Sequence, residues 1–454
     1  MRRRLRGAIV ALVALTLVGG VTSAANALTP PAPAPGDLGS SGSLRDYGTP
    51  TAAPGKSCPF VGQIPVQVPV VQPVSRTSVP ALAQLDLSQP SVPSSIHGEL
   101  CMTEKTLQAA RAGHAPTVLV LLHGITYGTP YWDFPYQPER YSAVDSLIQD
   151  GYATLNIDRL GSGRSAHPLS VLTTLANHAE TVHQIVGALR AGGIGGIPFR
   201  SVATIGHSYG SAIAWYEAAL HNDVDATIST GYTDRTNALN ASHLVATTLP
   251  AAAVPTTAGE PWAVDPGYLQ PRPGTRAIPE LYHLEAADPG AIAKDDELAS
   301  TVTAEEFASF PPPQYDGTIK NKTVPTFVVN GEYDTLTCGA DARYCATTAT
   351  TDDGPQALEA KATAFREWEA PAHNSASCLR AAVVPDAGHD VNLHPNAAQL
   401  YRTLAYFLDQ AVGTDGAQVA PYRAACDAAA AGSPADGLPE LGRLVPPVPT
   451  DGVG

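Results

Sequence analysis

The sequence predicts an α/β fold in which a mostly parallel sheet is flanked by helices and interrupted by an inserted lid. From residue 117 onward, short apolar runs typical of buried strands alternate with longer runs of helical periodicity. Strands that alternate with helices in this way form a parallel sheet covered on both faces. A segment rich in Ala, Thr and Pro, residues 235–322, then interrupts the alternation before it resumes.

The first 27 residues have the pattern of a signal peptide. Arginines precede an apolar run over residues 8–18, and Ala25-Asn26-Ala27 forms a small-x-small cleavage site. The apolar run is too short to favour a membrane span, with a retained anchor as the alternative. We therefore expect a secreted protein with no stable membrane anchor, which begins with a flexible leader rich in Pro, Ala and Gly at residues 28–57.

The charge of the chain excludes several classes of partner. The formal net charge is −15 at pH 7, and removal of the arginine-containing signal would make it more negative. No basic stripe with interleaved aromatic residues is present in the sequence. These properties favour solubility and argue against binding to nucleic acid or to anionic membranes. They do not indicate an oligomeric state.

Six cysteines are present, an even number that predicts disulfides in an exported chain. Their spacing does not resemble a zinc site, since the nearest two are seven residues apart without a histidine pair nearby. We expect no metal ion. Of the 15 possible pairings, we favour the set that preserves chain order: Cys58 with Cys101, Cys338 with Cys345, and Cys378 with Cys426.

The elements of the core can be assigned along the chain. Two β-type runs broken by prolines, residues 64–74 and 94–102, are typical of edge strands. They open a first part of the core, residues 58–234, which resumes as a second part at 323–411 and is followed by a tail, 412–454, expected to be irregular. Further strands are expected at 117–124, 152–160, 199–208, 224–232, 324–334 and 379–390, and helices at 139–151, 171–193, 209–222 and 396–412.

The 88-residue interruption of this pattern, 235–322, is predicted to be a lid over the active face. The alternative is a long surface excursion without contact to a substrate. One glycine-rich motif does not indicate a nucleotide site. Residues 161–166 match the G-x-G-x-x-A pattern of dinucleotide sites, but His167-Pro168 follows where such a site would begin a helix. We expect no bound cofactor.

Ser208 lies in a G-x-S-x-G pattern, Gly206-His207-Ser208-Tyr209-Gly210, between a predicted strand and a predicted helix. The glycines permit a tight turn that exposes the serine hydroxyl as a nucleophile. A serine hydroxyl needs a base to accept its proton and a third group to orient that base. The alternative for Ser208 is a helix N-cap.

The partners of Ser208 are expected at the ends of later strands. His389 follows the last predicted strand and is the candidate general base, in preference to His373 and His394. Asp334 follows the preceding strand, where a carboxylate can orient the imidazole. The competing acids are Asp234, which also follows a strand, and the neighbouring Glu332.

An oxyanion requires two backbone N–H groups. We expect one from Tyr209, directly after the nucleophile, and one from Ile125, in the loop after the first long strand. His123 in the same loop is expected to give structural support rather than to transfer protons. The aromatic residues that follow are candidates for the wall of an apolar acyl pocket, with simple core packing as the alternative: Tyr127, Tyr131, Trp132 and Phe134.

Together these motifs resemble the α/β-hydrolase family over residues 117–232 and 323–411. The resemblance rests on "HG" after a strand, "IDRLGSGRS", the elbow "GHSYG", "GEYD" and "AGHD". It implies an eight-stranded, mostly parallel sheet and a Ser208–Asp334–His389 triad. A serine at the elbow disfavours the epoxide hydrolase and dehalogenase branches, which carry aspartate there.

The resemblance implies a secreted serine hydrolase that cleaves a carboxylic ester or lactone through an acyl-enzyme on Ser208. One alternative is an exopeptidase or amidase of the same fold, although "HGITYG" differs from the "GGPG"-type loop usual in such enzymes. A non-catalytic binding protein on the same fold is a further alternative, because fold alone does not prove activity.

Overall fold

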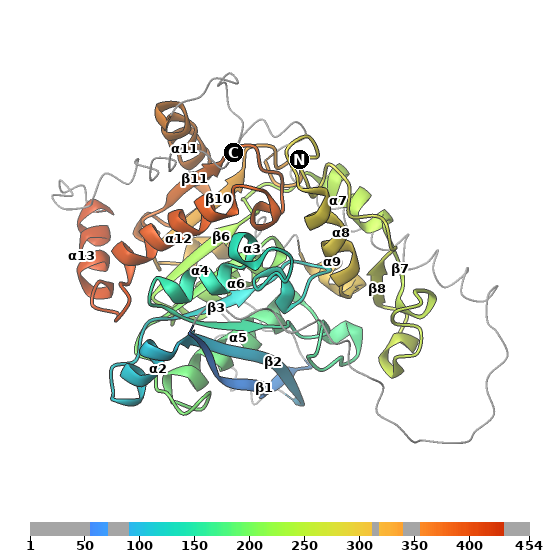
Figure 1. The fold of residues 1–454 in the computed structure, drawn as a ribbon, viewed down its shortest axis with the longest axis horizontal. Helices are drawn as coiled ribbons and strands as arrows, with labels where there is room; N and C mark the ends of the chain where they lie inside the picture. The colour runs from blue at the N-terminus through green and yellow to red at the C-terminus, as the bar shows by residue number, and fades with distance from the viewer. Residues whose placement is uncertain (1–54, 71–89, 311–316, 339–354, 431–454) are drawn as a thin grey trace.

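The centre of the molecule is an eight-stranded sheet (Figure 1). The computed structural model describes residues 55–70, 90–310, 317–338 and 355–430. In chain order the strands of this sheet are β1 (Lys56–Pro69), β2 (Ser91–Thr103), β3 (Val118–Leu122), β4 (Ala153–Ile157), β5 (Val202–His207), β6 (Ala226–Thr230), β10 (Thr326–Gly331) and β11 (Arg380–Val384).

The strand order across the sheet is β1-β2-β4-β3-β5-β6-β10-β11. From β4 to β11 all neighbours are parallel, whereas β1 pairs antiparallel with β2 and β2 antiparallel with β4. Strands β3 to β6 are buried at every position, as parallel strands covered on both faces must be. The prediction of a mostly parallel sheet is therefore confirmed, and the proline-containing β1 lies at its edge.

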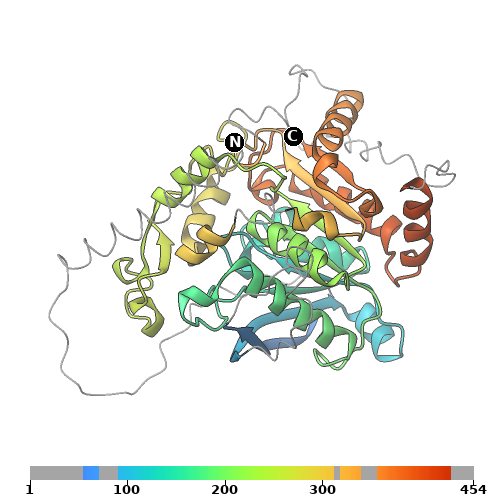
Figure 2. The ribbon, with the colours of Figure 1, turned by 180° about the vertical axis from the view of Figure 1, so that it is seen from behind.

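Helices cover both faces of the sheet. Helices α4 (Ala143–Gln149) and α12 (Ala397–Ala411) cross the face seen in Figure 1, and α5 (Leu175–Arg190) and α6 (Tyr209–His221) cover the opposite face, seen in Figure 2. Each face encloses one of the two large hydrophobic clusters of the core. The remaining helices of the core are α2 (Glu104–Arg111), α3 (Pro138–Tyr141), α11 (Pro355–Glu369) and α13 (Val419–Ala430).

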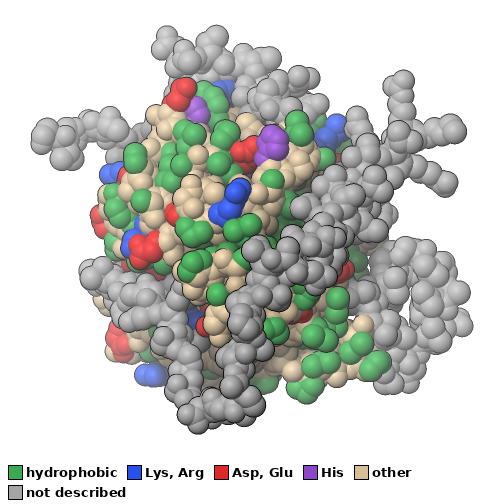
Figure 3. Space-filling model, turned by 90° about the vertical axis from the view of Figure 1, so that its right-hand side faces the viewer, with side chains coloured by type: hydrophobic (Ala, Val, Ile, Leu, Met, Phe, Trp, Pro, Cys, Tyr) green, Lys and Arg blue, Asp and Glu red, His purple; other side chains and the backbone are tan. Residues whose placement is uncertain are grey.

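The insertion between β6 and β10 contains a small sheet of its own, in the order β7-β8-β9. Figure 3 views the molecule from the side on which this part lies, and hydrophobic side chains there are interspersed with charged ones. The elements of the insertion are α7 (Ala238–Ala246), β7 (Thr248–Pro250), β8 (Tyr268–Pro271), α8 (Pro289–Leu298), β9 (Val302–Thr303) and α9 (Ala304–Ser309).

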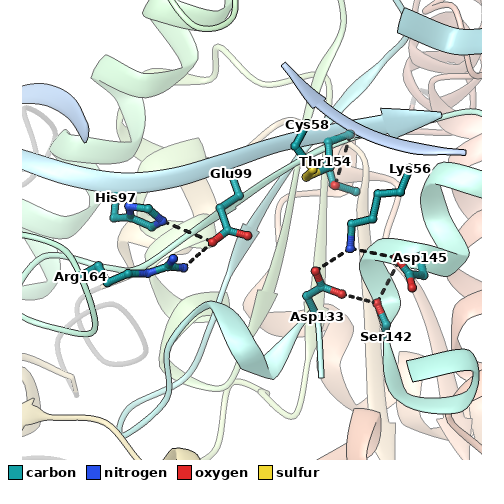
Figure 4. The surroundings of a disulfide bond; sticks show 10 residues. Lys56, Cys58, His97, Glu99, Asp133, Ser142, Asp145, Thr154 and Arg164 are labelled. Atoms are coloured by element: carbon teal, nitrogen blue, oxygen red, sulfur yellow. Dashed lines mark hydrogen bonds and ion pairs between the residues drawn. A yellow bond between two sulfur atoms is a disulfide. The ribbon is translucent and has the colours of Figure 1, made fainter. Parts of the chain in front are cut away.

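A disulfide joins the antiparallel strands β1 and β2 to each other, and buried ion pairs fasten β1 to the core (Figure 4). Cys58 is bonded to Cys101 across the pair. The ammonium of Lys56 lies 2.6 Å from a carboxylate oxygen of Asp133 and 2.9 Å from one of Asp145. Burial disfavours the charged form of Lys56, but the two carboxylates raise its pKa above the usual range. The edge strand β1 therefore begins at the anchored Lys56, so the last two residues of the expected leader, 56 and 57, belong to the sheet.

Two of the three expected disulfides lie in the described residues, and both are present. They join Cys58 to Cys101 and Cys378 to Cys426. The third expected pair includes Cys345, which lies outside the described residues, as do the expected signal peptide and most of the leader.

Residues 419–430 contradict the expectation of an irregular tail, because they form helix α13. This stretch contains six alanines, which favour a helix, and its only proline lies in the first turn, where the missing N–H costs nothing. The buried Tyr422 and the disulfide of Cys426 hold the helix against the core.

The helix expected over residues 139–151 is divided into α3 and α4 at Ser142. Ser142 has an extended backbone, with φ −88° and ψ 107°, and its hydroxyl accepts a hydrogen bond from the N–H of Asp145. This side chain therefore caps a new helix. None of the helices in the described part of the chain is both long and apolar enough to cross a membrane.

Candidate active site

Ser208 occupies the turn between β5 and α6 with a backbone that only a constrained site maintains. Its φ is 51° and its ψ is −119°. The flanking glycines are required by close backbone contacts. A Cβ atom at Gly206 would lie 2.4 Å from the amide nitrogen of Ser211, and one at Gly210 would lie 2.1 Å from the carbonyl oxygen of Leu122. The G-x-S-x-G pattern is thus a steric requirement of this turn.

Asp334 and His389 are in direct contact. Nδ1 of His389 donates a hydrogen bond to Oδ2 of Asp334 over 3.0 Å. The other carboxylate oxygen of Asp334 accepts hydrogen bonds from the amides of Leu336 and Thr337 at 2.9 and 3.0 Å. This geometry leaves Nε2 of the imidazole as the proton acceptor, which is the tautomer that a general base needs.

The buried acid and base shift each other's pKa. Burial disfavours the charged carboxylate of Asp334, but His389 and the surrounding hydrogen-bond donors lower its pKa below the usual range. Burial also disfavours the imidazolium of His389, but the carboxylate raises the pKa of this histidine above 6.5. The pair therefore consists of an ionised acid beside an imidazole that readily holds a proton.

The two competing acids lie beside other partners. The amide of Asp234 donates a hydrogen bond to Glu369 over 2.7 Å. The carboxylate of Glu332 forms an ion pair with Lys361 on α11. Of the three candidates, only the acid at position 334 forms a hydrogen bond with His389 in the described residues.

A second histidine supports the loop that carries the base. Nε2 of His394 accepts hydrogen bonds from the amides of Gly388 and His283, at 3.1 and 3.2 Å. Its Nδ1 therefore carries the proton and donates to the carbonyl oxygen of Asp390 over 2.9 Å. Burial lowers the pKa of His394 and favours this neutral form. Both neighbours of His389 are thus held in place by one imidazole.

The structure brings the acid and base together, and the residue before the serine lies next to the base. The ring of His207, directly before Ser208, has its centroid 4.9 Å from that of His389 and stacks on Tyr131 at 4.3 Å. The hydroxyl of Ser208 makes no hydrogen bond to any described residue. The structure therefore does not form the serine–histidine hydrogen bond of the expected triad.

The two candidate oxyanion amides lie on either side of the serine. Tyr209 is the first residue of α6, and the first-turn amides of a helix have no carbonyl partner within it. The loop after β3 packs closely on the turn, because a Cβ atom at Gly124 would lie 3.1 Å from Cβ of Ser208. The amide of the next residue, Ile125, donates no hydrogen bond within the described residues. Both amides are free to bind a developing negative charge.

Arg159 fixes the loop that carries Ile125. This buried guanidinium donates hydrogen bonds to the carbonyl oxygens of His123 and Gly124, at 3.0 and 3.1 Å, and forms an ion pair with Glu306 of α9. Burial disfavours ionisation of Glu306, but Arg159 is the main group that lowers its pKa to about 2. Nε2 of His123 accepts a hydrogen bond from the amide of Arg159, so this histidine is neutral.

The residue after Ile125 is clamped by the insertion. Thr126 has a positive φ of 64°, which is uncommon for a β-branched residue. Arg276 donates to the hydroxyl and the carbonyl oxygen of Thr126, at 2.8 and 2.7 Å, and the amide of Ser300 donates to the same carbonyl at 2.8 Å. These contacts stabilise the backbone conformation that orients the loop.

A buried acidic network, which the motifs did not reveal, links this clamp to the base. Asp390 follows His389 and accepts hydrogen bonds from Nε2 of His207 at 3.1 Å and from the hydroxyl of Tyr127 at 2.7 Å. Arg276 lies over the ring of Tyr127 and 3.5 Å from Asp295. Burial is the main cause that raises the pKa of Asp295, to about 7.

Only part of this network had a sequence signal. Asp390 stands beside the predicted base in "AGHD", where its position after a strand end could have marked it. Arg276 and Asp295 belong to the insertion and follow no motif, so their roles depend on contacts more than a hundred residues away.

The four aromatic candidates for the pocket wall are all buried in the core: Tyr127, Tyr131, Trp132 and Phe134. Tyr127 and Tyr131 pack on each other and on His207, Trp132 meets Tyr131 edge-on, and Phe134 meets Tyr141 edge-on. A cavity of about 130 Å³ lies elsewhere, between the 163–167 loop and the insertion, where none of the four lines it. Its lining includes Ser300, which also holds the oxyanion loop.

Three residues of the site lie close enough together to hold a metal ion: His207, His389 and Asp390. Several of their polar atoms have protein partners, since Nε2 of His207 donates to Asp390 and Nδ1 of His389 donates to Asp334. The hydroxyl of Tyr127 occupies the second oxygen of Asp390. This hydrogen-bond network uses both carboxylate oxygens of Asp390, and it leaves open Nε2 of His389, the atom that remains as proton acceptor in the pair with Asp334.

The sheet and the strand-end site define an α/β hydrolase. A family model described as the alpha/beta hydrolase family matches residues 119–399, and the chain belongs to that family. A search of curated proteins finds no match.

The chain is similar to solved structures at low identity. A thermophilic esterase from Thermogutta terrifontis is 15% identical, with coverage of 77% of this chain and 99% of the esterase, and a TM-score of 0.45. A monoglyceride lipase variant from Saccharomyces cerevisiae is 13% identical, with coverage of 70% of this chain and 91% of the lipase, and a TM-score of 0.43. A methylesterase from Arabidopsis is 14% identical, with coverage of 64% of this chain and 99% of the methylesterase, and a TM-score of 0.39.

Proposed function

We propose that this protein is a secreted serine hydrolase that cleaves a carboxylic ester or lactone through an acyl-enzyme on Ser208. The observation that carries the proposal is the hydrogen bond between Asp334 and His389 at the strand ends, beside a serine on a constrained turn. A nucleophile, an acid and a base in this chain order are the parts that acyl transfer requires.

In the first half of the reaction, Nε2 of His389 takes the proton of the Ser208 hydroxyl as its oxygen attacks the substrate carbonyl. The Asp334 carboxylate stabilises the imidazolium that forms. The carbonyl π electrons move to oxygen, and the amides of Tyr209 and Ile125 donate hydrogen bonds to the resulting oxyanion. When the tetrahedral species collapses, the bond to the alkoxy group breaks and His389 gives its proton to the leaving oxygen.

In the second half, water replaces the alcohol. His389 removes a proton from the water, whose oxygen attacks the acyl carbon. The same two amides stabilise the second oxyanion. The bond to the Ser208 oxygen then breaks, His389 returns the proton to that oxygen, and the carboxylic acid leaves. A lactone follows the same steps, with its alcohol and acid ends remaining in one molecule.

We propose that the insertion, residues 235–322, acts as a lid and contributes to substrate selection. Three contacts support this assignment: Arg276 and Ser300 hold Thr126 next to the oxyanion loop, and Glu306 pairs with Arg159 beneath it. The signal pattern of residues 1–27 and the two disulfides support export.

The proposal is tested with p-nitrophenyl acyl esters and aminoacyl anilides, assayed side by side with the secreted protein. We expect ester turnover and fluorophosphonate labelling, both abolished in Ser208→Ala. The matched control is Ser211→Ala, one turn further along α6, which retains both. Turnover of anilides alone indicates the exopeptidase alternative. If a folded protein shows neither labelling nor turnover, it is a binding protein and the proposal is wrong.

A further inference from the structure

A group of ionisable side chains lies at the far end of α6 from Ser208. His183 projects from α5, Glu217 from the last turns of α6, and Asp223 from the loop after it. One polar atom from each of these residues lies within 4.8 Å of the corresponding atoms of the other two. At 1.5 Å per residue, Glu217 is about 14 Å along the helix from the nucleophile, so this group is separate from the active site.

Glu217 is the unusual member of the group. The residue is fully buried, and neither of its carboxylate oxygens accepts a hydrogen bond within the described residues. A buried carboxylate without partners is strongly destabilising, and buried charges in proteins are normally paired or bound to a metal. Burial is the main cause that raises the pKa of Glu217 well above the usual range, followed by a side-chain hydrogen bond with Asp223. A cation bound beside Glu217 would allow this carboxyl group to ionise in its buried position.

The other two members present donor atoms to the same place. Nδ1 of His183 lies 2.6 Å from Oδ2 of Asp223, whose second oxygen is also buried without a hydrogen-bond partner. The ring of His183 stacks on that of His221, with centroids 3.7 Å apart and planes 8° from parallel. The stacking restricts the imidazole, as a ligand must be restricted.

We propose that His183, Glu217 and Asp223 form a binding site for a divalent transition-metal ion, with Zn²⁺ as its best occupant. One imidazole and two carboxylates are ligands that zinc accepts, whereas calcium and magnesium take oxygen ligands. Tetrahedral bonds of 2.0–2.2 Å place ligand atoms about 3.4 Å apart, so small side-chain rotations bring this group onto one ion.

The site is open to solvent on one side. The side chains of His183 and Asp223 are 38% and 27% exposed, whereas Glu217 closes the site from inside. A water molecule is the natural fourth ligand at the exposed side. Because the ligands come from α5, α6 and the following loop, the ion would join the two helices that cover one face of the sheet. Its role would be structural.

The competing explanation is a proton shared between Glu217 and Asp223. In that case the pair is satisfied without a metal, and the protein does not respond to zinc. The two explanations differ most for Glu217→Gln. An amide can replace a protonated carboxyl at little cost, but it removes one anionic ligand from a metal site.

The first experiment measures zinc binding to the purified secreted protein after EDTA treatment and dialysis. We expect one equivalent of Zn²⁺ by isothermal titration calorimetry. We also expect the melting temperature to rise by about 3 °C when free Zn²⁺ is 100-fold above its Kd. Ester turnover is recorded in parallel, because the ion lies away from the nucleophile and should leave the turnover of the folded protein unchanged.

The second experiment assigns the ligands. His183→Ala and Glu217→Gln should each lose the bound equivalent and the rise in melting temperature. The matched control is His243→Ala, which removes another surface histidine paired with a carboxylate, Glu280, at 3.0 Å. The control should bind zinc as the unaltered protein does. Absence of zinc binding, or binding that persists in both ligand variants, would overturn the proposal whether or not the protein hydrolyses esters.

Discussion

Arg276→Met should separate the contribution of the insertion to catalysis from its contribution to stability. The guanidinium of Arg276 donates to the hydroxyl and the carbonyl oxygen of Thr126, and it also lies beside the buried carboxylate of Asp295. Methionine retains much of the apolar stem but removes the charge and both hydrogen bonds. The backbone of Thr126 then loses the groups that hold its positive φ.

The magnitude follows from these contacts. Two hydrogen bonds from a charged donor are worth about 1.5–3 kcal/mol each, and removal of one partner from a buried ion pair costs about 3–5 kcal/mol. We therefore expect the free energy of unfolding to fall by about 3–5 kcal/mol. If the amide of Ile125 also moves out of line, kcat should fall by about 10²–10³, the usual effect of losing one oxyanion donor.

The assay compares thermal unfolding with kcat for a p-nitrophenyl ester, measured at a temperature at which the variant is folded. Arg272→Met provides the control, because Arg272 lies in the same insertion but is exposed and contacts only its own segment. The double variant Arg276→Met/Asp295→Asn removes the unpaired charge as well. It should recover stability but not kcat. If Arg276→Met retains the kcat of the control, the insertion does not position the oxyanion loop.

Three further outcomes follow from the site and the disulfides. Asp334→Asn should lower kcat by about 10⁴, whereas Asp234→Asn should leave it near the original value in the same ester assay. Because Asp334 raises the pKa of His389, the base must lose its proton above pH 6.5. A pH–rate profile should therefore show activity that is lost as the pH falls through an inflection above 6.5, and an inflection below 6.5 would contradict this pairing. Cys378→Ser/Cys426→Ser opens a loop of 48 residues and should lower the free energy of unfolding by about 2–4 kcal/mol. Chemical denaturation measures this effect, and an unchanged midpoint would show that the bond does not stabilise α13.

The elements that sequence predicted well are those governed by short-range rules. The apolar runs of β3 and β5 can only be buried strands of a covered sheet, and the two glycines around Ser208 reflect backbone contacts within a few ångströms. Asp334 and His389 could be placed because parallel strands bring their carboxyl ends to one edge of the sheet.

The parts that sequence missed depend on distant contacts or on a single side chain. Arg276 belongs to no motif, and its importance comes from Thr126, 150 residues earlier in the chain. The break between α3 and α4 depends on one serine that caps a helix in place of continuing it. The sequence favoured neither a pocket wall nor core packing for the four aromatic residues at 127, 131, 132 and 134. Their burial in the core is set by neighbours from distant parts of the chain, such as His207 against Tyr127 and Tyr131.

The two arginines that hold the oxyanion loop have a consequence for protein engineering. Arg159 comes from the core and needs a carboxylate, Glu306, that the insertion supplies; Thr126 comes from the core and needs a cation, Arg276, that the insertion also supplies. The insertion is therefore not an exchangeable module. A chimaera that receives this segment from another protein must reproduce both charges at both positions, or the loop that carries Ile125 and Thr126 will be misaligned in the recipient.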